Sequence, residues 1–287
     1  ETIAKHRPDD VYVEWSVNEK AAMELAAGAS YAGARSMVTM KQVGLNVASD
    51  PLMSLEYVGI KGGMVILVAD DPGPISSQTE QDTRHFSRFS KLPCFDPSSA
   101  QEAYEMIQEA FEYSEKYGTP VFLRPTTRVC HGYASIMVKD ETEYTHHQPE
   151  GFIKDSKRWV IFPRLSFMNH KKIEARNQEL SDIFSSYEKN TIHPSCDAFK
   201  DSKKGIATGG ISYTYTMETL KKTGMVKTLK IATPHPFPEK LAVDFLSGLD
   251  EVLCLEELDP VIERELIYIC GKYHLPTRIN GKLSGHT

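Results

Sequence analysis

Short apolar runs alternate with helical stretches through the first half of the chain. The nearly pure apolar run Met64–Ala69 is typical of a strand covered on both faces. Apolar residues at steps of three and four predict a helix over Asn18–Ala34, and Gly118 ends a longer helix at Ala100–Tyr117. The other predicted elements are strands at Val11–Trp15, Ser36–Met40 and Pro120–Arg124 and helices at Val47–Val58 and Asp82–Ser90.

The alternation stops between residues 139 and 203 and then resumes. This polar segment contains a charged helical stretch at His170–Lys189, and we interpret it as a crossing between two domains. The later elements are strands at Gly205–Thr208, Thr228–Ala232 and Glu251–Leu255 and helices at Tyr213–Thr223, Pro238–Leu246 and Pro260–Tyr273. The pattern predicts an α/β protein with parallel or mostly parallel sheets. We expect one domain at 1–140, a connector at 141–203 and a second domain at 204–287.

Composition and charge narrow the functional classes. A chain of 287 residues with 40% hydrophobic residues suits about two globular domains. Acidic residues outnumber basic ones, 39 to 33, and a net charge of −6 argues against a general nucleic-acid binder. We find neither a run of ~20 apolar residues that would span a membrane nor an apolar signal core. We therefore expect a cytoplasmic protein that does not associate with membranes.

The metal-ligating residue types are sparse in this sequence. The five cysteines are widely spaced without a C-x-x-C pair, which is typical of free thiols and excludes a local iron–sulfur or zinc motif within the chain. His146 with His147, and His193 with Cys196, are too few to close a metal site. We expect no metal site formed by this chain.

Three polar segments follow predicted strands: Lys41–Asn46, Asp70–Asp82 and Arg124–Arg128. Ligands of open α/β sheets bind beyond the carboxyl ends of the strands. Three such segments at one edge favour a binding site, although ordinary solvated turns explain the pattern about equally well.

Glu19 has two interpretations. Ser16-Val-Asn-Glu19 is an S-x-x-E capping box ahead of an apolar helix, and capping is the commoner role of such a glutamate. Glu19 also follows the first predicted strand, where a carboxylate that contacts a cofactor would lie. The pattern leaves both interpretations open.

Several longer motifs carry a resemblance that covers nearly the whole chain. The most specific are Glu14–Lys20, Ala26–Arg35, Thr39–Met53, Val68–Pro74 and Ser76–Arg84, with shorter ones at Leu123–Arg128, Pro238–Leu241, Val252–Leu258 and Gly281–Leu283. Together they resemble the alpha subunits of indolepyruvate:ferredoxin oxidoreductases, which are thiamine-diphosphate enzymes.

The resemblance implies oxidative decarboxylation of indolepyruvate and related aryl 2-oxo acids to acyl-coenzyme A, with ferredoxin as the electron acceptor. It implies a pyrimidine-binding domain followed by a transketolase-C-like domain. The implied partners are coenzyme A, a beta subunit and ferredoxin, in a dimer of heterodimers. The alternatives are a subunit of another 2-oxo acid:ferredoxin oxidoreductase and a non-catalytic assembly module with the same fold.

The resemblance also implies site residues. In the family the acid at the position of Glu19 contacts N1′ of the aminopyrimidine, which implies a catalytic role; burial beside Trp15 would raise its pKa. We expect cofactor contacts from Lys41, Gln42 and Asn46, and a substrate cleft lined by Ser77, Gln78, Glu80 and Gln81.

The chain resembles a fragment of that family. We find no counterpart of the family's extreme N-terminal segment, its diphosphate- and magnesium-binding domain or its iron–sulfur tail. We therefore expect thiamine diphosphate with Mg²⁺ to need the missing domain, iron–sulfur clusters to lie only outside this chain, and the isolated chain to be inactive.

Overall fold

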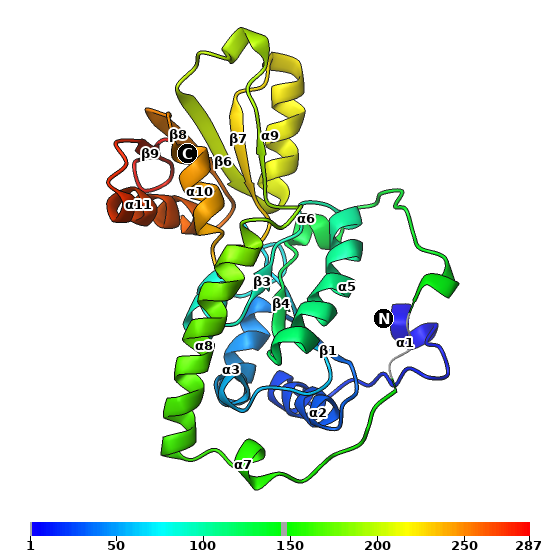
Figure 1. Cartoon of the computed structure of the whole chain (residues 1–287). Helices are drawn as coiled ribbons and strands as arrows, with labels where there is room; N and C mark the ends of the chain where they lie inside the picture. Colours follow the sequence, from blue (N-terminus) through cyan, green and yellow to red (C-terminus); the bar gives the residue numbers. More distant parts are fainter. Residues whose placement is uncertain (1, 145–147) are drawn as a thin grey trace.

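The computed structural model describes residues 2–144 and 148–287, and its strands form two sheets (Figure 1). The first contains β1 (Ser36–Lys41), β2 (Met64–Ala69), β3 (Cys94–Phe95) and β4 (Val121–Leu123). The second contains β5 (Thr191–His193), β6 (Lys204–Gly209), β7 (Lys227–Ile231), β8 (Glu251–Leu255) and β9 (Arg278–Asn280). The orders are β1-β2-β4-β3, entirely parallel, and β5-β7-β6-β8-β9, in which the β5–β7 pair is antiparallel. The predicted α/β class with two mostly parallel sheets is confirmed.

Helices flank both sheets. In the first half they are α1 (Thr2–Lys5), α2 (Glu19–Tyr31), α3 (Gln42–Val58), α4 (Thr83–Ser90), α5 (Ala100–Tyr117) and α6 (Thr127–Cys130). In the second half they are α7 (Ser156–Trp159), α8 (Pro163–Phe184), α9 (Gly210–Thr223), α10 (Glu239–Leu246) and α11 (Val261–Tyr273), and short 3₁₀ turns lie at Glu141–Glu143 and Asp197–Phe199. Among residues 2–144 and 148–287, no helix combines the length and apolar character needed to cross a membrane.

The strand β2 lies between two hydrophobic cores. Its alternate residues Met64, Ile66 and Val68 pack in one core with side chains of α2 and α3. Val65, which points to the other face, packs in a second core with residues of α5 and α8 such as Met106. Both faces of the strand are therefore covered, as its uninterrupted apolar sequence predicts.

The long helix α8 bridges the two halves of the molecule (Figure 1). Its Arg176 donates to the carboxylate of Glu56 in α3, with Nη2 and Oε1 2.8 Å apart. Five residues on, near the C-terminus of α8, the Ser181 hydroxyl donates to the carbonyl of Phe237, which precedes α10, over 2.6 Å. The predicted charged helix in the crossing segment is thus present, but it starts seven residues earlier than predicted. The chain then forms β5, which belongs to the second sheet.

Two predicted features of the first half are wrong. Val11–Trp15 forms no strand: Tyr12 and Trp15 are 72% and 80% exposed, and alternating side chains make a strand only where a neighbouring strand is available to pair with it. Lys41–Asn46 is not a loop, because Lys41 ends β1 and Gln42 begins α3. The buried stripe of α3 already includes Leu45, so the helix begins five residues before the predicted Val47.

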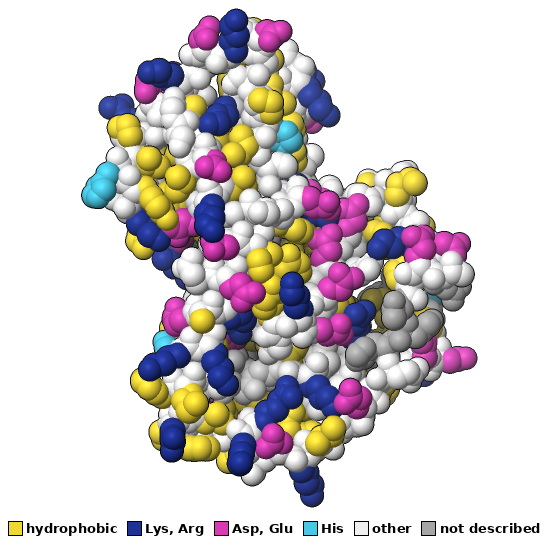
Figure 2. All heavy atoms as spheres, viewed as in Figure 1, with side chains coloured by type: hydrophobic (Ala, Val, Ile, Leu, Met, Phe, Trp, Pro, Cys, Tyr) yellow, Lys and Arg dark blue, Asp and Glu magenta, His cyan; other side chains and the backbone are white. Residues whose placement is uncertain are grey.

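Acidic side chains gather over α5 (Figure 2). The helix carries Glu102, Glu105, Glu109, Glu112 and Glu115. Basic groups from other elements match several of them: Lys189 pairs with both Glu105 and Glu109, Lys230 with Glu102, and Arg35 with Glu115. Much of this negative charge is therefore neutralised within the chain.

Candidate functional site

Glu19 begins α2 and does not act as the acid of a capping box. The N-cap is Asn18, whose Oδ1 accepts a hydrogen bond from the amide of Ala21 at 2.9 Å. The Ser16 hydroxyl donates to the carboxylate of Glu14 instead of to the helix. Asn caps helices as well as Ser does. The N-cap is therefore two residues later than the Ser16 that the motif suggests. The capping-box interpretation is wrong.

The Glu19 side chain lies against Gly44 in the first turn of α3. A Cβ at position 44 would lie 2.6 Å from Glu19 Cγ, a distance that real contacts do not reach, so only glycine leaves room for this carboxylate. Trp15, the expected apolar neighbour, is 80% exposed and does not bury Glu19 in this chain. Glu19 therefore lies over the helix that follows β1, at the carboxyl edge of the first sheet.

The structure brings the predicted cofactor contacts and the predicted cleft loop together. Lys41 Nζ donates to the carbonyl and hydroxyl of Ser76 at 3.1 and 2.8 Å. Gln42 Nε2 donates to the Thr79 carbonyl at 3.0 Å, and Asn46 Nδ2 donates to Gln81 Oε1 at 2.9 Å. The first turn of α3 and the loop after β2 are thus one hydrogen-bonded unit.

The remaining predicted residues lie in the same loop. Glu80 Oε1 accepts a hydrogen bond from the amide of Gly73 at 2.8 Å, the Ser77 amide donates to Asp71, and Gln78 is exposed. Gln42 is 1% exposed, and its Oε1 is buried without a hydrogen-bond partner in the described part of the chain. A buried acceptor of this kind favours a ligand donor beside Gln42.

A buried ion cluster at the same edge was missed by the sequence analysis. Arg124 Nε donates to Asp70 Oδ2 at 2.6 Å, and its Nη1 lies 3.2 Å from both oxygens of Asp96. Arg84 binds Asp82 at 2.6 Å and reaches Glu256, after β8 of the second sheet, at 2.7 Å. All members of the cluster are nearly inaccessible to solvent: Asp70, Asp82, Arg84, Asp96, Arg124 and Glu256. The signal in the sequence that could have revealed this cluster is the position of charged residues directly after wholly buried strands.

The carboxyl groups of this cluster differ in their proton affinity. Burial raises the pKa of Asp96 to about 6, despite the opposing effect of the Arg124 guanidinium. Burial also opposes ionisation of Asp82, but Arg84 and Arg124 outweigh it and hold the pKa of that carboxyl well below its usual range. The cluster therefore contains one acid that titrates near neutrality and one that stays ionised.

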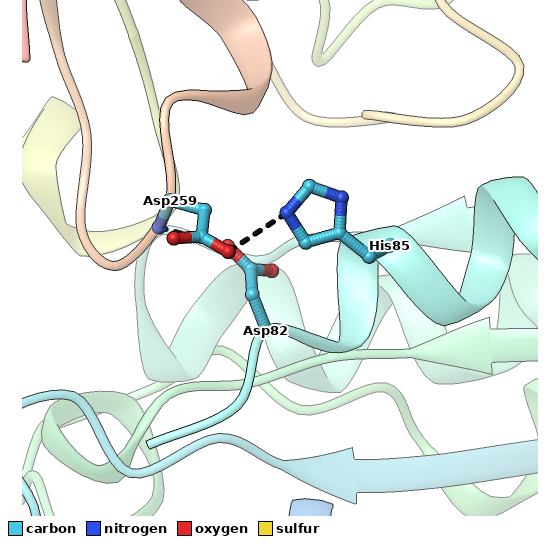
Figure 3. A group of neighbouring side chains, drawn as sticks. All are labelled: Asp82, His85 and Asp259. Carbon is cyan, nitrogen blue, oxygen red and sulfur yellow. Dashed lines mark hydrogen bonds and ion pairs between the residues drawn. The ribbon is translucent and has the colours of Figure 1, made fainter. Parts of the chain in front are cut away.

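Asp82, His85 and Asp259 form a group whose ligand atoms lie within 4.8 Å of one another (Figure 3). His85 Nε2 and Asp259 Oδ2 are 2.8 Å apart, beside a cavity of about 280 Å³ lined by Glu80, Asp82, Leu258 and Asp259. Both oxygens of Asp82 already accept hydrogen bonds from Arg84, so a cation would have to compete with a guanidinium. We interpret this group as part of the domain junction.

Of the other histidines considered above, His193 is described, and its Nε2 lies 3.0 Å from the Tyr213 hydroxyl. His146 and His147 lie outside the described residues.

Comparison with known proteins shows the family of this chain. The family described as pyruvate flavodoxin/ferredoxin oxidoreductase, thiamine diphosphate-binding, matches residues 1–195. The chain belongs to this family. The match contains the whole first sheet, Glu19 and the loop after β2.

Curated relatives extend the similarity to the second sheet. The chain is 42% identical over 277 residues to indolepyruvate oxidoreductase subunit IorA of Methanothermobacter thermautotrophicus, covering 96% of this chain and 44% of the relative. For the subunit of the same name from Pyrococcus abyssi, the identity is 41%, with 95% and 42% covered. The chain spans less than half the length of these curated relatives.

Two solved structures share the fold. A 2-oxoglutarate:ferredoxin oxidoreductase from Magnetococcus marinus superposes with a TM-score of 0.64 at 16% identity, over 93% of this chain and 53% of that one. A split-gene transketolase gives a TM-score of 0.62 at 16% identity, over 97% and 77%. These likenesses show that the chain shares the α/β fold of both proteins.

Proposed function

We propose that this chain is the pyrimidine-binding and transketolase-C-like part of a thiamine-diphosphate oxidoreductase. The enzyme would oxidatively decarboxylate indolepyruvate and related aryl 2-oxo acids to acyl-coenzyme A, with ferredoxin as the electron acceptor. The observation that carries the proposal is the packing of the Glu19 side chain against Gly44, beside the hydrogen-bonded unit of α3 and the loop after β2. A member of this family needs an acid at such a place.

The residues present suit the aminopyrimidine end of the cofactor. Gly44 leaves room for the carboxylate, and the buried Oε1 of Gln42 offers a free acceptor suited to an exocyclic amine. When bound, thiamine diphosphate would supply a nucleophilic thiazolium carbon. The role of Glu19 would be to share a proton with pyrimidine N1′. A glutamine amide can donate a hydrogen bond to N1′ but cannot transfer a proton to it.

The substrate end of the proposed cleft is the loop after β2. The exposed ammonium of Lys41 is complementary to the carboxylate of a 2-oxo acid. Under this proposal Asn46 supports the loop, and the cleft itself is lined by Ser77, Gln78, Glu80 and Gln81.

The rest of the machinery is assigned to other parts of the assembly. We include in the proposal that a further domain binds the diphosphate and Mg²⁺, and that iron–sulfur clusters lie outside this chain. A beta subunit, ferredoxin and coenzyme A are the proposed partners, in a cytoplasmic dimer of heterodimers. The family match and the name of the relatives support this view.

The decisive experiment is Glu19→Gln in the assembled enzyme, with Glu24→Gln on the same helix as the matched control. We expect Glu19→Gln to lower turnover by about 10² or more, as for a lost acid–base group, while the control keeps its turnover. Turnover is measured as indolepyruvate-dependent reduction of ferredoxin, together with the melting temperature of each variant. Intact turnover of Glu19→Gln would reject the proposal and favour an assembly module.

A further inference from the structure

Asp71 ties together the segments that leave two neighbouring strands. It is the second residue after β2 and is 4% exposed. Its Oδ2 accepts hydrogen bonds from the amides of Ile75, Ser76 and Ser77 at 3.1, 2.9 and 3.0 Å. Its Oδ1 accepts one from the hydroxyl of Thr127, which begins α6 after β4, at 2.9 Å. One carboxylate therefore fixes the loop after β2 to the neighbouring strand end.

This arrangement requires an ionised carboxylate. The hydrogen bond from the Ser76 amide is the largest of the effects that hold the pKa of Asp71 well below its usual range. Successive backbone amides that converge on one point form an anion-binding concavity in proteins. Here the protein's own carboxylate fills the concavity, so the loop is fixed before any ligand arrives.

The effect of Asp71 reaches Lys41 through one residue. Ser76 is held by Asp71 on its amide side, and its carbonyl and hydroxyl are the acceptors for the Lys41 ammonium. The amide of Gly73, which has a φ of +59°, is held by Glu80. The loop offers Lys41 a defined pair of acceptors only while Asp71 holds Ser76 in place.

We propose that Asp71 is a positioning residue of the site: by holding the amides of residues 75–77 it fixes the acceptors that orient the Lys41 ammonium toward the substrate carboxylate. The inference rests on the proposed function, in which Lys41 faces a 2-oxo acid. Asp71 acts through Lys41, so its loss weakens substrate binding only while Lys41 is present.

The test is a double-mutant cycle with Asp71→Asn and Lys41→Ala in the assembled enzyme. Asparagine keeps the size of the side chain but replaces one acceptor oxygen with a donor and removes the charge. We expect each single variant to raise KM for the 2-oxo acid by about tenfold, with kcat changed less than about threefold. The double variant should have the KM of Lys41→Ala alone, because positioning has no effect once the ammonium is gone.

A stability control separates positioning from folding. Ser114→Ala removes buried hydrogen bonds to Met64 and Thr119 at the opposite, amino end of β2. We expect it to lower the melting temperature and leave KM unchanged. In the chain itself, hydrogen exchange of the amides of residues 75–77 should quicken in Asp71→Asn and not in Ser114→Ala.

The outcomes are distinct. If Asp71→Asn only lowers the melting temperature, as Ser114→Ala does, or if its effect multiplies with that of Lys41→Ala, the inference is overturned and the proposed function stands. If Lys41→Ala leaves KM unchanged, the proposed cleft fails and the inference fails with it. If Asp71→Asn does not fold, Thr127→Val replaces it in the cycle, because this variant removes one donor to Asp71. We then expect KM to rise about threefold, and this rise should vanish in the Lys41→Ala background.

Discussion

The carboxyl ends of the two sheets carry similar residues but are used differently. In the second sheet this edge is packed against the first half of the chain: Glu256 binds Arg84, and the carbonyl of Ala232 accepts a hydrogen bond from the amide of Asp96 at 2.8 Å. In the first sheet half of the edge is equally buried, around Arg124, whereas Lys41 stays exposed. Polar residues after parallel strands therefore leave room for a ligand only where the edge remains open.

The energetic roles of the two kinds of edge differ accordingly. In the closed part, two arginines and four carboxylates are nearly inaccessible to solvent and pair with one another, and the Arg84–Glu256 pair joins the two halves of the chain. Glu256 also accepts the amides of Val261 and Ile262 at the start of α11. In the open part, hydrogen bonds position exposed side chains such as Lys41, and the buried carboxylate of Asp71 accepts backbone amides and the Thr127 hydroxyl instead of an arginine. The closed part should govern stability and the open part should govern activity.

The largest expected effect is on the closed part. Arg124→Leu leaves Asp70 and Asp96 buried without their cation and should lower the free energy of unfolding by about 3–5 kcal/mol. Arg128→Leu, four residues on with a side chain 65% exposed, should cost about 0–1 kcal/mol. Urea unfolding of the two variants checks the contrast, and equal losses would remove the distinction between the two parts of the edge.

The second effect concerns pH. The pKa of Asp96 is about 6 in the folded chain, against 3.8 for the free group, so the folded state binds the proton more tightly. Its contribution to stability is full below pH ~4 and is lost as pH rises through about 6, by an amount on the order of 3 kcal/mol. Asp96→Asn removes this dependence.

The measurement is the difference in unfolding free energy between wild type and Asp96→Asn across pH 4 to 7.5. We expect the wild type to lose stability relative to the variant as pH rises. Comparing the two chains cancels other titrations, such as that of His235, whose pKa burial lowers to about 3. A difference that stays flat over this range would show that Asp96 is ionised throughout.

The smallest expected effect on stability comes from the open part. Lys41→Ala in the assembled enzyme should lower kcat/KM by about tenfold, which corresponds to about 1.4 kcal/mol of transition-state stabilisation. The melting temperature should stay close to that of the wild type, because the ammonium is exposed. A large fall in melting temperature with unchanged kcat/KM would place Lys41 with the structural cluster instead.

Local periodicity predicted most elements of the fold. Long helices such as α5 match their predicted bounds because capping residues such as Ser99 and Gly118 are visible in the sequence. The strands β3, β5 and β9 have two or three residues each, which is too short for any period to register. The wrong strand at Val11–Trp15 is rich in the β-branched and aromatic residues that favour strands, but no neighbouring strand pairs with it among the described residues.

The site was predictable in part. Parallel strands place their carboxyl ends at one edge, which is why Lys41, Gln42 and Asn46 were expected near the loop that contains Gln81, and these segments do meet. The Arg84–Glu256 pair joins residues 172 positions apart, which no local pattern reveals. Roles for Glu19 and the cleft residues stay predictions.

The strand β5 makes the linear boundary between the halves a poor place to divide the polypeptide. It pairs with β7 through Thr191–His193, although it precedes β6 and lies within the crossing segment. In a chain beginning at Lys204, β7 would be an exposed edge strand. Its unpaired backbone amides and carbonyls could then pair with a strand from another molecule. Anyone expressing the second half alone should begin before Thr191, or expect self-association.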